Sequence, residues 1–322
     1  MEDKTNLIVV VGPTAIGKTK ISIELAKILN GEIVSADSMQ VYKYMDIGTA
    51  KPTLEERQGI SHHILDVVEP DQDFNVAIYQ KIAKEAIDHI YEKDKLPIVV
   101  GGSGLYIDSI VYPLDFTDAK EDQELRDKLY RVVDKKGNLF IHQKLMKVDP
   151  VTGKKVHPND VKRIVRAMEI YHLTGKPMSE YRQNLKNAEI PYELAMIGLT
   201  MDRSKLYDRI NRRVDEMIQK GLVYEVQELL NKGYGKDLIS MQGLGYKELI
   251  EYIEGKSSLE EAVEIIKRDT RRFAKRQLTW FRKDKRIYWI DIEDFPDEDS
   301  LKAHLFHHII EKLSLNKEDF AL

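Results

Sequence analysis

The sequence predicts an α/β fold whose parallel sheet is interrupted by a helical insertion. Near the N-terminus, short apolar runs alternate with amphipathic helical patterns, which indicates βαβ units and therefore a parallel sheet. The first apolar run ends in a glycine-containing turn that opens directly into a helical pattern. From about Thr117 to Glu189 the pattern is helical, and we find no convincing strand there.

The elements of the first half follow from local patterns. Leu7–Val11 is a short, β-branched run ended by Gly12, which is typical of a buried parallel strand. A helix is expected over Lys18–Leu29 and a second strand over Glu32–Ser35. Apolar residues spaced i, i+3, i+4 and i+7 between Tyr79 and Ile90 predict a helix packed on the sheet. A third strand, Leu96–Val100, ends at a pair of glycines.

The helical patterns divide the chain into two predicted domains. Residues 117–189 form the insertion, whose apolar stripes include Leu129 and Met168. Residues 1–116 and 190–322 form the α/β core with additional C-terminal helices, because Ala195–Leu199 and Ile287–Ile290 again resemble buried strands. One long helix of the intervening section is expected to begin with a capping box, Ser257 or Ser258 paired with Glu260 or Glu261.

Composition excludes several classes of protein. The chain has 322 residues, a net charge of −4 and no cysteine, so disulfides and thiolate zinc sites are excluded. We find no apolar run long enough for a membrane helix and no signal peptide, and we expect a cytoplasmic monomer without a membrane partner. Basic charge is localised: Lys267–Arg286 holds ten Lys or Arg and two Asp, and Lys154–Arg166 holds five and one.

A phosphate-binding loop lies between the first strand and the first helix. The motif G-x-x-x-x-G-K-[ST] is formed by Gly12, Pro13, Thr14, Ala15, Ile16, Gly17, Lys18 and Thr19. Backbone N–H groups and the helix N-terminus attract an anion, Lys18 adds a full charge, and the Thr19 hydroxyl can bind Mg²⁺. The motif predicts a core like that of the P-loop NTPases.

The usual acidic partner of such a loop is missing from its expected place. P-loop NTPases normally carry an apolar strand that ends in Asp, which holds Mg²⁺. The strand Leu96–Val100 runs instead into Gly101-Gly102-Ser103-Gly104. Asp37, at the end of the second strand, could take that role, but its neighbours suggest another one.

The motifs together resemble those of the tRNA dimethylallyltransferase (tRNA isopentenyltransferase) family. The resemblance begins with the phosphate loop and continues in the same order through Asp37–Tyr42, Met45–Pro52, Gly101–Tyr106, Arg209–Val226, Gly245–Glu248 and Ala274–Arg282. It implies transfer of a dimethylallyl group from dimethylallyl diphosphate to the exocyclic amine of the adenosine 3′ to the tRNA anticodon. One departure is Ser103, where the family more often has Thr, but the hydroxyl is retained.

The resemblance and the chemistry together assign the catalytic residues. Asp37 is expected to act as the general base for the amine, with a water-mediated Mg²⁺ ligand as the alternative. Lys18, the loop amides, and Thr19 with Mg²⁺ would stabilise the leaving diphosphate. By resemblance, Ser103 and Arg213 also contact the diphosphate. The alternatives are a turn serine for Ser103 and a solvated helix face for Arg213.

Contacts with the tRNA anticodon loop are expected at three places. By resemblance, the extruded base is held by Asp37, Ser38, Met39, Gln40 and Ser103, although Gln40 also fits an ordinary loop residue. The insertion is expected to contact tRNA through Asn159, Asp160, Val161, Lys162, Arg163 and Arg166. The long basic helix would contribute Arg271, Arg272, Lys275 and Arg276, and the alternative for these charges is a solvated face.

Two other functions compete with this hypothesis. A P-loop kinase for a small metabolite or nucleotide explains the phosphate loop but leaves the insertion and the basic segments unused. An RNA-binding factor that uses a nucleotide as a switch predicts tRNA binding without covalent change. Binding of ATP or another nucleotide at the loop, in competition with the prenyl donor, also stays open.

Overall fold

The computed structural model describes residues 4–113, 122–180 and 189–320, and the chain forms two compact units. The first unit comprises Met1–Ile110 and Tyr192–Leu322, and the second comprises Val111–Pro191. The second unit extends a few residues beyond the insertion expected at 117–189 on each side. Among the described residues, no helix combines the length and hydropathy needed to cross a membrane.

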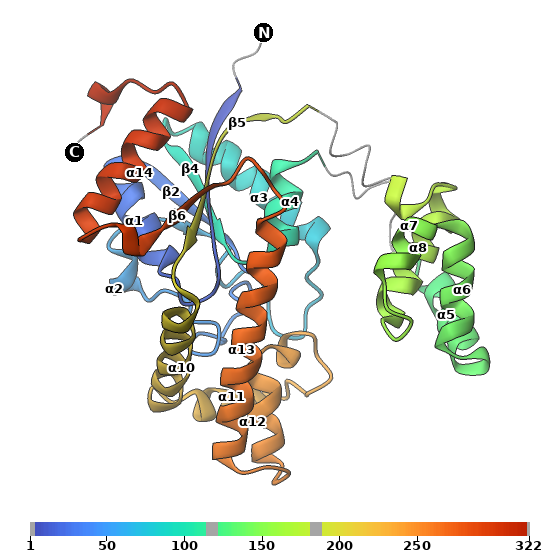
Figure 1. Ribbon diagram of the computed structural model, residues 1–322. Coiled ribbons are helices and arrows are strands. Elements are labelled where there is room, and N and C mark those ends of the chain that lie inside the picture. Colours follow the sequence, from blue (N-terminus) through green and yellow to red (C-terminus); the bar gives the residue numbers. More distant parts are fainter. Residues whose placement is uncertain (1–3, 114–121, 181–188, 321–322) are drawn as a thin grey trace. The chain divides into compact units, whose positions relative to one another are not determined.

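A parallel sheet forms the centre of the first unit, as predicted, and it has six strands where the sequence indicated five (Figure 1). Its order is β3-β2-β4-β1-β5-β6. The strands are β1 (Thr5–Val11), β2 (Gly31–Ala36), β3 (His62–His63), β4 (Leu96–Gly101), β5 (Tyr192–Thr200) and β6 (Tyr288–Asp291). Gly101 is in register with both Val11 of β1 and Ala36 of β2. The carboxyl ends of these three strands therefore lie side by side.

Helices cover the sheet because their apolar stripes need burial. The helices of this part are α1 (Lys18–Ile28), α2 (Leu54–Arg57), α3 (Val76–Tyr91), α4 (Gly104–Val111) and α14 (Glu298–Lys312). Helices α1 and α14 share one buried cluster with the strands, in which Leu25 and Phe306 are fully buried. Four elements of this part have no counterpart in the sequence pattern. They are β3, which has only two residues and no apolar run, and the helices α2, α4 and α14.

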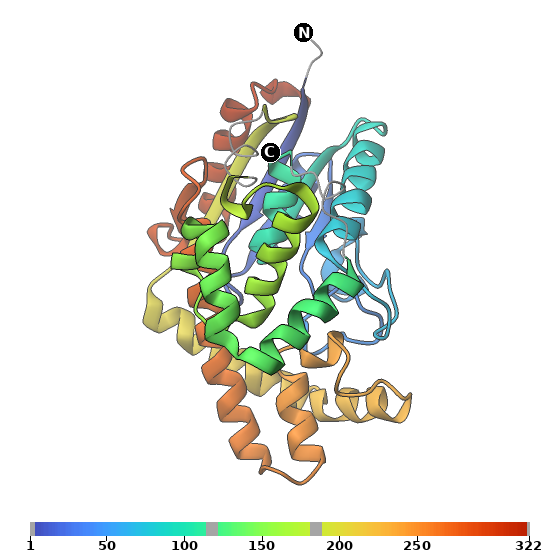
Figure 2. The same ribbon diagram turned by 90° about the vertical axis from the view of Figure 1, so that its right-hand side faces the viewer.

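A group of helices lies at the edge of the sheet where β1, β2 and β4 end (Figures 1 and 2). They are α10 (Arg203–Gln219), α11 (Leu222–Asn231), α12 (Tyr246–Ile253) and α13 (Leu259–Phe281). Helix α13 begins with a capping box between Ser258 and Glu261, which selects one of the expected pairs. It packs on α10 and α12. Three 3₁₀ turns complete this unit: Ser240–Gln242, Ile292–Asp294 and Lys317–Asp319.

The second unit is helical in the part that the structure describes. It contains α5 (Gln123–Lys136), α6 (Asn138–Val148), α7 (Pro150–Lys155) and α8 (Val161–Thr174). The predicted stripes meet in its own small core, which includes Leu129 and Met168. Glu169 of α8 is fully buried and accepts hydrogen bonds from Arg126 Nε at 2.9 Å and Arg166 at 2.6 Å. These bonds join α8 to α5 and compensate the buried charge.

Candidate active site

The phosphate loop, Gly12–Thr19, connects β1 to α1 as the motif predicts. Gly17 caps α1 with a φ of 103°, a left-handed conformation that favours glycine, and no side chain caps the helix. The first N–H groups of α1 are therefore available to an anion. Lys18 folds back over the loop, and its Nζ donates to the carbonyl oxygens of Gly12 at 3.0 Å and Pro13 at 2.9 Å.

The charge of Lys18 is only weakly compensated. Burial, reinforced by the positive charge of Arg213, lowers the pKa of Lys18 to about 8, against the opposing effect of Asp37. Arg213 lies on α10 and is half-buried, so it is not on a solvated helix face. Burial also lowers the pKa of its guanidinium, and nearby Asp37 opposes this. Two desolvated cations beside a phosphate loop form a site that favours an anion.

Asp37 and Ser103 lie at adjacent strand ends. Asp37 directly follows β2, and its Oδ1 accepts a hydrogen bond from the Met39 N–H at 2.9 Å. Ser103 follows β4, and its N–H donates to the Ala36 carbonyl at 3.2 Å. The Ser38 N–H donates to the Ser103 Oγ at 3.1 Å. Asp37, Ser38, Met39 and Ser103 are thus brought together at the carboxyl edge of the sheet, where ligands bind in open α/β folds.

Gln40 belongs to the support of this site in the present structure. Its side-chain oxygen accepts from the Ser35 hydroxyl at 3.1 Å, and its Nε2 donates to the carbonyls of Thr49 at 3.2 Å and Ala50 at 3.3 Å. These bonds occupy the amide that would read an adenine edge. The geometry favours the loop role over base recognition for Gln40.

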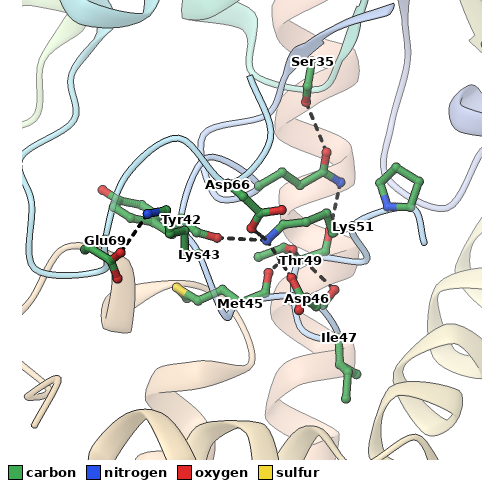
Figure 3. Close-up of polar contacts among 12 residues, drawn as sticks. Ser35, Tyr42, Lys43, Met45, Asp46, Ile47, Thr49, Lys51, Asp66 and Glu69 are labelled. Carbon is green, nitrogen blue, oxygen red and sulfur yellow. Dashed lines mark hydrogen bonds and ion pairs between the residues drawn. The ribbon is translucent and has the colours of Figure 1, made fainter. Parts of the chain in front are cut away.

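Two groups that the sequence analysis did not identify hold the segment Tyr42–Pro52. Lys51 is buried, and its Nζ donates to the Tyr42 carbonyl, to Asp46 at 2.6 Å and to Asp66 at 2.5 Å (Figure 3). From α11, the Glu225 carboxylate accepts the N–H groups of Asp46, Ile47 and Gly48 at 2.9, 2.7 and 3.1 Å. Neither role follows from local spacing, because the partners come from distant parts of the chain.

A cavity of about 700 Å³ opens beside the phosphate loop. Its walls are the start of α1, the segment from Asp46 to Gln58, and one face of α10. The α10 face brings the cations Arg209, Arg212 and Arg213, while Ile47 and Met217 provide apolar surface. Thr19 also lines the cavity. Carboxylates of Asp46, Glu56 and Glu216 also line the cavity, but its basic side chains outnumber them, so a ligand with an anionic head and a short apolar chain fits it.

The residues proposed to contact tRNA lie on α13 and at the start of α8. On α13, Arg271 bonds to Asn211 at 2.5 Å and Arg272 to Asp269 at 2.9 Å. Lys275 and Arg276 are exposed. In the second unit, the positions concerned are Asn159, Asp160, Val161, Lys162, Arg163 and Arg166. There Asp160 caps α8, and Arg166 is engaged with the buried Glu169.

One residue of α13 differs from the interpretation of the sequence. Trp280 lies in an apolar pattern of the sequence, which favours a place in the core over a base-stacking role, but it is 38% exposed. Its ring covers Gly104, where an added Cβ would lie 2.3 Å from the ring. The helix thus uses Trp280 to contact the loop that carries Ser103. The interpretation was wrong because Trp280 packs on the backbone of half-buried Gly104, which leaves part of the ring exposed.

Comparison with known proteins identifies the family. The family model described as IPP transferase matches residues 40–284. The chain is 53% identical over 304 residues to the tRNA dimethylallyltransferase of Acetivibrio thermocellus, covering 94% of this chain and 97% of the relative. It is 56% identical over 285 residues to that of Carboxydothermus hydrogenoformans, covering 88% and 91%.

Solved structures agree with these relatives. The tRNA isopentenylpyrophosphate transferase from Bacillus halodurans has a TM-score of 0.74 at 45% identity, covering 98% of this chain and 99% of that one. A eukaryotic dimethylallyltransferase acting on tRNA has a TM-score of 0.81 at 29% identity, covering 97% and 80%. The predicted resemblance is therefore confirmed, and this chain belongs to the IPP transferase family.

Proposed function

We propose that this chain transfers a dimethylallyl group from dimethylallyl diphosphate to the exocyclic amine of the adenosine 3′-adjacent to the tRNA anticodon, releasing diphosphate. The observation that carries the proposal is the geometry of the sheet edge. The phosphate loop, Asp37 and Ser103 follow three neighbouring strands whose ends are in register. A site for the diphosphate of the donor and a general base for the acceptor amine therefore lie at the same edge of the sheet, in a chain of this family.

In the proposed reaction the amine nitrogen attacks the allylic carbon. The exocyclic amine of adenine is a poor nucleophile because its lone pair is delocalised into the ring. As the N–C bond forms, Asp37 accepts the amine proton, and the C–O bond to the diphosphate breaks with its electron pair. The hydrogen bond from the Met39 N–H holds the Asp37 carboxylate in a fixed orientation.

The leaving diphosphate collects negative charge, which the loop residues stabilise. Lys18 and Arg213 supply positive charge, and the amides at the start of α1 supply hydrogen bonds. Ser103 faces the same edge, and its Oγ also lies 3.3 Å from the Ser38 hydroxyl. The apolar side chains of the cavity would accept the prenyl chain.

Mg²⁺ fits the donor set of this site. Among the described residues, no group of three or more His, Asp or Glu side chains could hold a metal ion. Mg²⁺ commonly binds through one or two protein ligands together with substrate phosphates and water, so the Thr19 hydroxyl beside the cavity would supply one ligand and the diphosphate the others. When bound there, Mg²⁺ would neutralise charge on the departing diphosphate.

The acceptor must leave the stack of the anticodon loop before it can reach Asp37. Extrusion of a base costs a few kcal/mol and is least costly in a single-stranded loop. Ser38, Met39 and Ser103 lie beside Asp37, where the base would arrive. The basic positions on α8 and α13 would recover the cost through contacts with the phosphate backbone. We place this activity in the cytoplasm, with a monomer as the active form.

The test is mass analysis of tRNA after incubation with the protein, Mg²⁺ and dimethylallyl diphosphate. The proposal predicts that one adenosine gains a dimethylallyl group and that diphosphate is released only when tRNA is present. Parallel samples with ATP separate the alternatives. Consumption of ATP without a prenylated nucleoside would support a kinase, and binding of tRNA without any mass change would support a nucleotide-dependent switch.

A further inference from the structure

Gln277 is a buried polar residue in the apolar stripe of α13. Its side chain is 6% exposed and lies between the buried residues Ala274 and Phe281. Burial of an amide is costly unless its donors and acceptors are hydrogen-bonded. The hydrogen-bond partners of Gln277 therefore explain why a polar residue lies on the buried side of this helix.

The amide of Gln277 joins two loops that are distant in sequence. Its Oε1 accepts a hydrogen bond from the Thr14 N–H of the phosphate loop at 2.9 Å. Its Nε2 donates to the Gly102 carbonyl, in the loop after β4, at 3.1 Å. A Cβ on Gly102 would lie 2.1 Å from this Nε2, so the glycine allows the close approach. A single side chain therefore holds both loops.

The second of these loops leads directly to the proposed general base. Ser103 is bonded to the end of β2 through the Ala36 carbonyl and through the Ser38 N–H. Asp37 lies between these two contacts. Short covalent segments and hydrogen bonds thus run without a gap from Thr14 through Gln277 and Ser103 to Asp37. The carbon attached to the diphosphate and the amine presented at Asp37 can react only if the distance between the phosphate loop and Asp37 is correct.

We propose that Gln277 is a positioning residue that sets the distance between the diphosphate-binding loop and Asp37, an inference that rests on the proposed function. The residue contacts neither substrate. It acts through its hydrogen bonds with the Thr14 N–H and the Gly102 carbonyl. Because Lys275 and Arg276 lie on the exposed side of the same helix, α13 connects the tRNA-binding surface to the donor site.

The first experiment compares Gln277→Met with wild type. Methionine has a similar volume but makes neither hydrogen bond. Since small misplacements of reacting groups cost up to about 10²-fold, kcat should fall by about 10- to 100-fold. The affinity for tRNA and the KM for the donor should stay within a few-fold of wild type. The matched control is Gln227→Met on α11, whose amide donates to Asn231 on the same helix; its kcat should match that of wild type.

The second experiment uses the pH profile of Gln277→Glu. An ionised carboxylate keeps the acceptor for Thr14 but repels the Gly102 carbonyl, whereas a protonated carboxyl restores both hydrogen bonds. Burial raises the pKa of such a carboxyl, so kcat of the variant relative to wild type should rise as the pH falls from about 8 to about 6. A purely structural role would not produce this partial rescue.

The possible results distinguish failure of the proposed function from failure of the positioning role of Gln277. If wild-type protein prenylates no tRNA, the proposed function fails and the inference fails with it. If wild type is active and Gln277→Met keeps its kcat, the inference alone is overturned. Should the methionine variant fail to fold, the glutamate variant decides, because a relative kcat independent of pH contradicts the positioning role.

Discussion

Two lysines of the first unit, one half-buried and one buried, have opposite surroundings. Lys18 in the phosphate loop contacts two backbone carbonyls and has Arg213 nearby, so desolvation lowers the pKa of its ammonium group. Lys51, in the segment beside the loop, is held by the carboxylates of Asp46 and Asp66. The charge of Lys51 is compensated within the protein, whereas the charge of Lys18 is left to attract an anion.

This difference in charge compensation distinguishes the residues that bind the reacting groups from the residues that hold the surrounding loop in place. A desolvated cation without a carboxylate partner destabilises the folded protein and stabilises a bound diphosphate. A buried cation with two carboxylates holds a loop in place and has little attraction left for a ligand. The same residue type therefore serves catalysis in one place and folding in the other.

The largest expected effect is at Asp37, which belongs to the reacting side. Asp37→Ala should lower turnover by about 10²–10⁴-fold, the usual contribution of a general base, with little change in tRNA affinity. Asp66→Ala is the control, because it removes a carboxylate from the supporting side. Steady-state kinetics and a tRNA binding assay measure both. Turnover of Asp37→Ala within a few-fold of wild type would refute the assignment.

Lys18→Met should lower turnover by about 10²–10³-fold, because the developing charge on the diphosphate loses its main cation. The same change removes a desolvated and poorly compensated charge, which offsets the loss of its hydrogen bonds to Gly12 and Pro13, so the free energy of unfolding should not fall. Kinetics and urea denaturation at neutral pH test the two parts. A variant that is both less stable and fully active would contradict the distinction between the lysines.

Lys51→Met should have the opposite pattern. Loss of its three hydrogen bonds leaves the Tyr42 carbonyl unsatisfied, which should lower the free energy of unfolding by about 2 kcal/mol. The turnover of the folded fraction should change much less than in Lys18→Met. Urea denaturation and kinetics on the same preparation measure this. If stability is unchanged, Lys51 does not have the supporting role.

The pKa of Lys18 predicts a pH dependence. The free enzyme loses the ammonium proton as the pH rises through about 8, well below the usual value of 10.5. The kcat/KM for the prenyl donor should therefore fall about tenfold per pH unit above that point, because this parameter reports the free enzyme. The kcat should fall less, since a bound diphosphate favours the charged lysine. Retention of kcat/KM up to about pH 10 would contradict the lowered pKa.

The smallest effect is expected on the exposed side of α13. Lys275→Met or Arg276→Met should weaken tRNA binding and reduce the slope of log affinity against log salt by about one unit for each phosphate that the variant no longer binds. The KM for the donor should not change, unlike in Lys18→Met. Binding titrations at several salt concentrations measure the slope. A slope equal to that of wild type would show that Lys275 and Arg276 are solvated and do not contact the tRNA backbone.

Much of the fold could be predicted because its signals are local. The strand–loop–helix unit around Lys18 depends on neighbouring residues, namely an apolar run, glycines with special φ angles and a helical stripe. The capping box that begins α13 is likewise contained within four residues, Ser258–Glu261. The short strand β3 escaped prediction because its pairing with β2, and not its own residues, makes it a strand.

The sequence by itself determined the fold class, the phosphate loop and the family, since each follows from patterns within a strand, a turn or a motif. Only the tertiary structure decided what the distant polar groups do. Gln277 bonds to Thr14 across 263 positions, and Glu225 bonds to Ile47 across 178. No periodicity specifies such pairs, because their hydrogen bonds exist only after packing has brought the helices to the edge of the sheet.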